Sequence, residues 1–77
     1  MQKVIIEITE DDNNAFYVEA RKYPNRRPLG NHAAEYSQVV YHPLQVARAI
    51  RWVSEDVVRN NPNALIVKVK NLTNTPL

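Results

Sequence analysis

The chain has 77 residues, with one glycine, five prolines, no cysteine and a formal net charge of +2. This length allows one domain, because domains usually span about 100–150 residues. The absence of cysteine excludes disulfides, a thiolate nucleophile and cysteine-based zinc sites. The small positive charge does not by itself indicate nucleic acid, and a hydrophobic share of 44% excludes a disordered chain.

The expected core is small for a chain that folds alone. Surface scaling predicts that folding buries only about 63% of the surface of the unfolded chain. The free energy gained by burying this apolar surface nearly equals the conformational entropy cost of ordering the residues. We therefore expect a narrow stability margin, which a homodimer that buries more apolar surface would widen.

The first two predicted elements are strands. Apolar and polar residues alternate over 3–10, which places Val4 and Ile6 on one face. A second alternation covers 15–23, after a run of Asp and Asn at 11–14 that favours a turn. The two strands are expected to pair as an antiparallel hairpin.

The middle of the chain is less regular. Residues 24–31 hold two prolines and the only glycine, which predicts a loop. Residues 35–41 are predicted as a short third strand, and a helical piece over 32–37 is the competing interpretation. Whether residues 24–35 fold across the second face of the sheet stays open.

The helix is the clearest element. Its apolar side chains recur at helical spacing and form one stripe; they are Val46, Ile50, Val53 and Val57. Pro43 suits the first helical turn, whereas His42 before it is not a favoured capping residue. Residues 60–62, Asn-Asn-Pro, end the helix because a residue before proline avoids helical angles.

The last predicted strand spans 64–72, and residues 73–77 are expected to fray. Its alternation predicts two faces: Leu65, Val67 and Val69 toward the core, and Ile66, Lys68 and Lys70 away from it.

Together these elements predict a single α+β domain over residues 1–72. We expect a small sheet of three or four mostly antiparallel strands with one helix on one face, in the order strand, strand, optional third strand, helix, strand. The last strand is expected to run parallel to the first strand or to the strand before the helix.

No catalytic signature is present. Ser37 and Ser54 are the only serines, and neither lies in a glycine-flanked elbow. One glycine is too few for the usual phosphate-binding loops. His32 and His42 are ten positions apart, which is not the spacing of helical metal ligands. We expect no enzyme activity, no metal and no cofactor.

An acidic cluster, Glu7, Glu10, Asp11 and Asp12, is predicted at the turn of the first hairpin. It lacks the glycine and the alternating ligands of a calcium loop. A solvated turn is the favoured interpretation, and docking to a basic partner is the functional alternative.

A basic cluster lies at the other end of the hairpin, where Arg21, Lys22, Arg26 and Arg27 surround Tyr23 within seven residues. Guanidinium groups can grip phosphates while a tyrosine stacks on a base. A solvated loop is favoured, followed by protein docking and then by nucleic-acid binding.

Trp52 is predicted to point away from the apolar stripe, on the same side as Arg48 and Arg59. Two interpretations are open: a cation–π contact with Arg48, or an anchor for a partner or a second copy of the chain.

The second face of the sheet is predicted to carry aromatic, aliphatic and basic side chains: Ile5, Tyr17, Tyr23 and Ile66 among Arg21, Lys68 and Lys70. If the 24–35 loop covers them, they form a satellite core. If it does not, they form an exposed platform that suits single-stranded nucleic acid or protein.

The leading functional prediction is a non-enzymatic protein-interaction module, such as a small inhibitor or accessory subunit, that binds another protein or a second copy of itself. The residues predicted to bind this partner are Trp52, Arg48, Arg59, Tyr17, Tyr23, Arg26 and Arg27.

Two other functions stay open. The first is nucleic-acid binding through Arg21, Lys22, Arg26, Arg27, Lys68 and Lys70, and the second is a phage-type inhibitor of a nucleic-acid-handling complex. No membrane span or signal peptide is predicted, and together with the absence of cysteine this favours a cytoplasmic protein. No family resemblance is evident.

Overall fold

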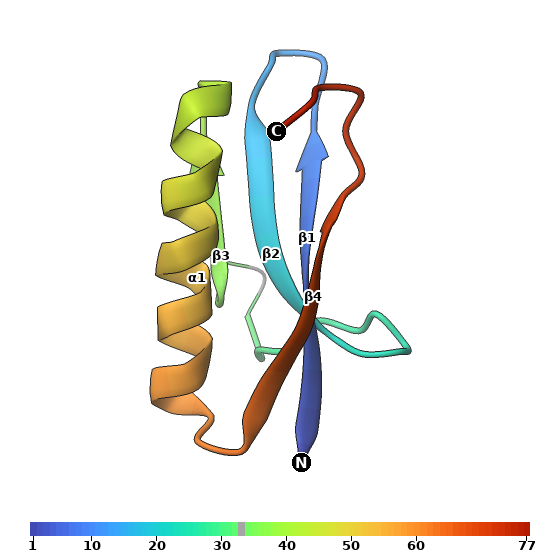
Figure 1. Cartoon of the computed structure of the whole chain (residues 1–77), viewed down its shortest axis with the longest axis vertical. Coiled ribbons are helices and arrows are strands. Elements are labelled where there is room, and N and C mark those ends of the chain that lie inside the picture. Colours follow the sequence, from blue (N-terminus) through green and yellow to red (C-terminus); the bar gives the residue numbers. More distant parts are fainter. Residues whose placement is uncertain (33) are drawn as a thin grey trace.

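The computed structural model describes residues 1–32 and 34–77. Its elements are β1 (Gln2–Glu10), β2 (Phe16–Lys22), β3 (Ser37–Val40), the short 3-10 helix η1 (Pro43–Gln45), α1 (Val46–Asn60) and β4 (Ala64–Asn71). The strands form one sheet in the order β3-β2-β1-β4, and α1 packs on one face of it (Figure 1). The predicted α+β class, with one helix on one face, is confirmed.

The pairing of the strands is mixed. β1 pairs antiparallel with β2 and parallel with β4, and β2 pairs antiparallel with β3. The expected hairpin is therefore confirmed, and of the two parallel neighbours predicted for the last strand, the first strand and the strand before the helix, the structure has the first. β3 and β4 are the two edges of the sheet.

The core fills the space between the sheet and α1. Strand residues of alternating position meet the apolar stripe of the helix: Val4, Ile6, Ile8, Phe16, Val18 and Ala20 face Val46, Ala49, Val53 and Val57. All ten are buried, and burial of each large aliphatic side chain contributes about 1.5–3 kcal/mol. The predicted helical stripe is confirmed, although Ile50 lies at its margin and is only partly buried.

The third strand is present, and the described residues of the competing helical prediction over 32–37 contain no helix: residues 34–36 form a turn, and residue 33 lies outside the described residues. The strand covers only Ser37–Val40, which is shorter than the predicted 35–41. The residue before it, Tyr36, has a left-handed backbone with φ 56°, and its carbonyl accepts a hydrogen bond of 3.0 Å from the Ala20 amide. Tyr36 and Leu29 both pack against the core, so the long loop is tied to the helix side of the sheet.

The start of the helix differs from the prediction in one respect. His42 does act as a cap, because its Nδ1 atom accepts a hydrogen bond of 3.1 Å from the Leu44 amide. An imidazole nitrogen here does what a Ser or Asp oxygen does at other helix starts. At the other end, the Asn61 amide donates to the Val57 carbonyl at 2.9 Å, and Pro62 follows.

The predicted faces of β4 are partly wrong because the strand contains a bulge. The register pairs Val4 with Ile66 and Ile5 with Lys68, so Val67 is an extra residue without a partner on β1. An extra residue reverses the alternation of the side chains after it. Residues before and after the bulge therefore do not follow one continuous alternation.

The bulge changes which residues of β4 reach the core. Ile66 packs against the core instead of facing away from it, and Leu65 leaves 46% of its surface exposed. Lys68 and Lys70 lie on the face away from the helix, as predicted, opposite Ile5 and Glu7.

After β4 the chain turns back beside the β1–β2 turn (Figure 1). Fraying is the sequence-based expectation for 73–77. In the structure, the Asn74 amide and the Thr75 hydroxyl donate to Glu10 Oε1 at 3.3 and 3.2 Å. The Thr73 hydroxyl also donates to Asn71 Oδ1 at 2.6 Å.

No helix within the described residues is both long enough and apolar enough to cross a membrane.

Candidate functional site

The residues predicted to bind a partner lie on two opposite sides of the molecule. Trp52, which is 54% exposed, lies with Arg48 and Arg59 on the outer surface of α1. The predicted tyrosines Tyr17 and Tyr23 lie at the opposite face of the sheet, where they are 39% and 37% exposed. One flat partner surface cannot contact both sets at once.

Of the two interpretations left open for Trp52, the cation–π contact with Arg48 is not found among the described residues. The cation–π contact that the structure does contain joins Lys68 to Tyr23, with Nζ 5.4 Å from the ring centre. Trp52 is therefore an exposed aromatic residue that makes no cation–π contact with the residues the structure describes.

The centre of the second sheet face holds a buried carboxylate. Glu7 is only 3% exposed, and its Oε2 atom accepts a hydrogen bond of 2.6 Å from Arg26 Nε. Its Oε1 atom accepts from Arg26 Nη2 at 3.2 Å and lies 3.3 Å from Arg21 Nε. The expectation of a solvated acidic cluster is thus wrong for Glu7, because long side chains from β2 and the following loop cover it.

The two arginines are engaged within the chain. Arg21 also lies 3.3 Å from a carboxylate oxygen of Glu19 and donates to the Arg26 carbonyl at 2.9 Å. The hydrogen bond to Glu7, and then its charge, raise the pKa of the Arg26 guanidinium. Donors held in this way are poorly placed to grip a phosphate group, which weakens the predicted phosphate-binding role of the basic cluster.

The other two cations of the cluster form no ion pair with Glu7 among the described residues, and Lys22 lies on a different face from these arginines. Lys22 lies opposite Val4 in the β1–β2 register, which places it on the helix side. Arg27 is exposed in the loop, where its amide donates to Asn25 Oδ1 at 2.9 Å.

The loop after β2 covers the second sheet face only in part. Residues 23–28 form a small hairpin, in which the Arg26 amide donates to the Lys22 carbonyl at 2.9 Å and the Lys22 amide to the Arg27 carbonyl at 2.8 Å. This hairpin projects on the side away from α1 (Figure 1), so the Arg26 side chain reaches Glu7. The later loop residues turn to the helix side, which leaves the tyrosines partly exposed.

The turn of the first hairpin is ordered by Asp11. Its Oδ1 atom accepts hydrogen bonds of 3.0 Å from the Asn13 and Ala15 amides, and its Oδ2 accepts one of 2.8 Å from the Tyr17 hydroxyl. The Tyr17 hydrogen bond, followed by the Ala15 amide, lowers the pKa of the Asp11 carboxyl. Asp11 thus has a structural role in the acidic cluster.

The open side of β4, with the residues along it, is here called the β4 edge, and no sequence pattern predicted it. Its exposed apolar side chains are Leu65, Val67, Val69 and, directly after the strand, Leu72; they are 36–46% exposed and lie on both faces of the strand. β4 is an edge strand, so part of its backbone has no strand partner and can pair with another chain. Apolar side chains beside unpaired backbone are a typical site for protein docking.

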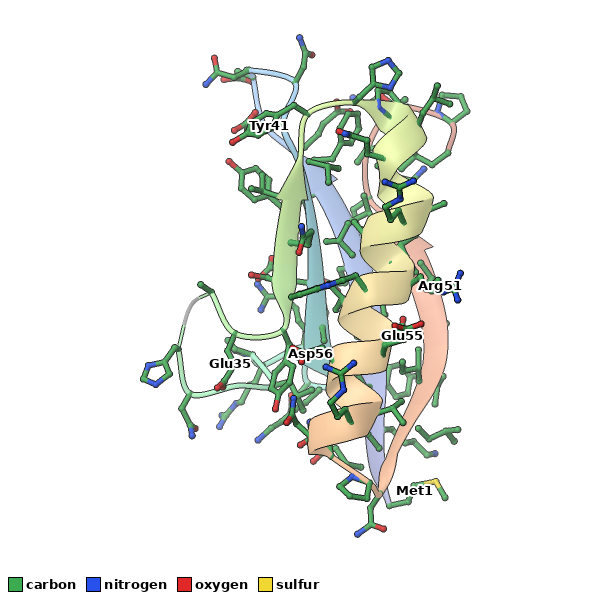
Figure 2. All side chains as sticks on the ribbon, turned by 90° about the vertical axis from the view of Figure 1, so that its left-hand side faces the viewer. Met1, Glu35, Tyr41, Arg51, Glu55 and Asp56 are labelled. Atoms are coloured by element: carbon green, nitrogen blue, oxygen red, sulfur yellow. The ribbon has the colours of Figure 1, made fainter. Side chains whose placement is uncertain are left out.

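A groove accompanies the β4 edge on the helix side, between α1 and β4, and is here called the α1–β4 groove. It has a volume of about 560 Å³. Apolar side chains line most of it, including Ile8, Leu44, Ile50, Val69 and Leu77, and Asn71 is a polar member. The groove exists because α1 packs mainly over β2 and β3. Figure 2 shows β4 emerging beside the helix, on the side of Arg51 and Glu55.

The β4 edge is positively charged on its other face. Lys68 and Lys70 form no ion pair within 4.0 Å with any residue that the structure describes. The nearby carboxylate of Glu7 is already bound by two arginines. The strand therefore presents unpaired lysines on one face and an apolar groove on the other.

Neither a cluster of metal ligands nor a match to a known protein points to a function. The described residues contain no group of three His, Asp or Glu side chains arranged to hold a metal ion. No protein-family model, curated protein or solved structure matches the chain.

Proposed function

We propose that this chain is a non-enzymatic protein-interaction module, an inhibitor or accessory subunit that docks through the β4 edge and the α1–β4 groove. The observation that supports the proposal is the set of exposed apolar residues, Leu65, Val67, Val69 and Leu72, on or directly after a strand whose outer side has no strand partner. Single exposed apolar residues are common and need no explanation. Several exposed apolar residues beside free backbone groups, one of which (Val69) also lines an apolar groove, are typical of an interface.

The total exposed surface supports the same proposal. The chain exposes 5386 Å², whereas a folded monomer of this mass is expected to expose about 4,800 Å². The excess is of the same order as the roughly 800 Å² that each partner buries in a standard protein interface.

The proposal is tested with the tagged full chain and two matched variants. Val67→Asp/Val69→Asp places charge on the β4 edge, and Val58→Asp places it on α1, where Val58 is 52% exposed. We expect the wild-type chain and Val58→Asp to capture the same partner, identified by cross-linking and mass spectrometry, and the edge variant to lose it. Capture of that partner by all three chains would contradict the proposal, as would the absence of any partner and of self-association in light scattering.

The helix surface remains a separate predicted contact. Trp52, with Arg48 and Arg59 beside it, is exposed on the opposite side of the molecule from the tyrosines, so a second partner surface is compatible with the first. A Trp52→Ala variant in the same capture experiment separates the two surfaces.

Nucleic-acid binding is the second candidate, and one observation favours it. Lys68 and Lys70 are not paired with carboxylates in the described structure, and the partly exposed ring of Tyr23 lies beside Lys68. This arrangement suits a single strand, with the phosphates on the lysines and a base on the tyrosine. Fluorescence titration with a labelled oligonucleotide tests it: we expect affinity to fall steeply with salt, and no binding at low salt would exclude this function.

A further inference from the structure

The β4 edge has free backbone groups in a defined place. The Leu72 amide donates to the Ile8 carbonyl of β1 at 2.9 Å. Because backbone groups alternate in direction along a strand, those of Asn71 and Val69 point away from β1 toward solvent. An added strand would find its hydrogen-bond partners at these two residues.

The two faces of the β4 edge predict the composition of such a strand. Lys68 and Lys70 are two positions apart and lie on the face away from the helix, where their register partners on β1 are Ile5 and Glu7. Side chains on adjacent strands lie close enough to pair, so acidic residues at alternating positions of the added strand would meet both lysines. The residues between them would point to the helix face, beside Val69 and the α1–β4 groove, where aliphatic side chains fit.

The same features disfavour a second copy of this chain as the occupant. Antiparallel pairing of two β4 strands would bring the lysines of both copies onto one face of the joined sheet, and like charges in adjacent strands repel. Lysines and bulges are also features by which proteins prevent edge-to-edge self-association. Edge-to-edge pairing of two copies is therefore disfavoured.

The acidic residues Glu10 and Asp11 of this chain are not available to pair with Lys68 and Lys70 of a second copy. Asp11 is held by Tyr17 and by the amides of its own turn. Glu10 is held by the Asn74 amide and the Thr75 hydroxyl.

We infer that the β4 edge accepts an extended segment of another protein in which acidic residues alternate with aliphatic ones, and that this segment adds to the sheet as a fifth strand beside β4. The inference rests on the proposed docking function and specifies the chemistry of the partner.

Two capped heptapeptides test the inference on the isotope-labelled full chain. The first is Ser-Glu-Val-Glu-Val-Glu-Ser, and the second has lysine in place of each glutamate. We expect the acidic peptide to bind roughly tenfold more tightly than the basic one, because its carboxylates meet unpaired lysines. We also expect it to slow hydrogen exchange at the Val69 and Asn71 amides. Equal binding of the two peptides, or unchanged exchange at these amides, would overturn the inference.

A charge-swapped chain gives the second arm of the test. In Lys68→Glu/Lys70→Glu the preference is expected to reverse, so that the basic peptide binds more tightly. A preference that stays with the acidic peptide would place the binding elsewhere and overturn the inference. The inference would also be overturned if the wild-type chain without peptide were a dimer whose Val69 and Asn71 amides were already protected from hydrogen exchange. A second copy would then occupy the β4 edge.

The outcomes separate this inference from the proposed function. If the acidic peptide does not bind but Val67→Asp/Val69→Asp still loses the captured partner, docking through the β4 edge stands. The inference that the partner segment is acidic is then wrong. If the edge variant also keeps its partner, both are wrong.

Discussion

Arg26 donates through Nε and Nη2 to both carboxylate oxygens of Glu7, at 2.6 and 3.2 Å, across nineteen positions of the sequence. This bidentate pair ties the small hairpin after β2 to the face of the sheet that α1 does not cover. It also explains how a carboxylate can be almost fully buried in a sheet that has a helix on only one side.

The first prediction concerns this buried carboxylate. Glu7→Gln removes the charge that both arginines face and leaves their donors without an equivalent acceptor. We expect the free energy of unfolding to fall by about 1–3 kcal/mol, the usual range for a lost buried hydrogen bond to a charged group, as measured by urea denaturation. The control is Glu55→Gln, which removes an exposed pair with Arg51 on α1 and should cost less than about 1 kcal/mol. Equal losses in the two variants would contradict a structural role for Glu7.

The second prediction concerns the pH dependence of the first turn. The hydrogen bond from Tyr17 lowers the pKa of Asp11 from its ordinary value of 3.8. A carboxyl with a lowered pKa in the folded state stabilises the fold above its unfolded pKa. That stabilisation is lost as the pH falls through the lower, folded pKa.

In Tyr17→Phe we expect the pKa of Asp11 to move up toward 3.8, followed by the carboxyl carbon signal in an NMR titration. Tyr23→Phe is the matched control, because Tyr23 does not take part in this turn. An Asp11 titration that stays unchanged in Tyr17→Phe would show that the tyrosine is not the cause.

The third prediction concerns the ionisation of Tyr17, the partner of Asp11, at high pH. The hydrogen bond to Asp11, and then its negative charge, raise the pKa of the Tyr17 phenol above 10.0. Its contribution to stability is therefore present below pH 10.0 and is lost as the pH rises through the raised value. Absorbance titration of Asp11→Asn should show one tyrosine ionising at lower pH than in the wild-type chain. Superimposable titration curves would rule out the coupling.

The fourth prediction concerns the imidazole cap of the helix. His42→Ala leaves the Leu44 amide without its acceptor, and we expect it to destabilise the fold by about 1 kcal/mol. His42→Asp supplies a carboxylate oxygen in place of the nitrogen and should recover most of that loss. Thermal unfolding followed by circular dichroism measures both. A His42→Asp chain no more stable than His42→Ala would argue against the capping role.

The fifth prediction compares two valines on the same helix. Val53 is fully buried and Val58 is 52% exposed. Val53→Ala leaves a cavity and should cost about 2 kcal/mol of unfolding free energy, whereas Val58→Ala should change it by less than about 0.5 kcal/mol. Similar losses from the two substitutions would mean that the helix phase described here is incorrect.

Two features of the site, the bulge in β4 and the burial of Glu7, depend on contacts that no local pattern shows. The Val67 bulge moved Ile66 into the core and left Leu65 exposed, although the letters of this strand alternate regularly. Glu7 is buried because Arg26 returns to it from a loop. An acidic residue within one strand and an arginine-rich loop after the next strand are the sequence signals for the Glu7–Arg26 ion pair. The spacing of these residues does not show which arginine reaches Glu7.

Local sequence patterns predict the elements and the fold class: the alternation in the first two strands, the helical stripe through Val53, and the outward direction of Trp52. These follow from backbone geometry, since a strand repeats every two residues and a helix about every 3.6. Long-range contacts set the rest: β4 lies at an open edge, its faces shift at Val67, and Trp52 and the tyrosines lie on opposite sides. Strand order and long-range pairing set which side chains remain exposed, and neither is encoded in local periodicity.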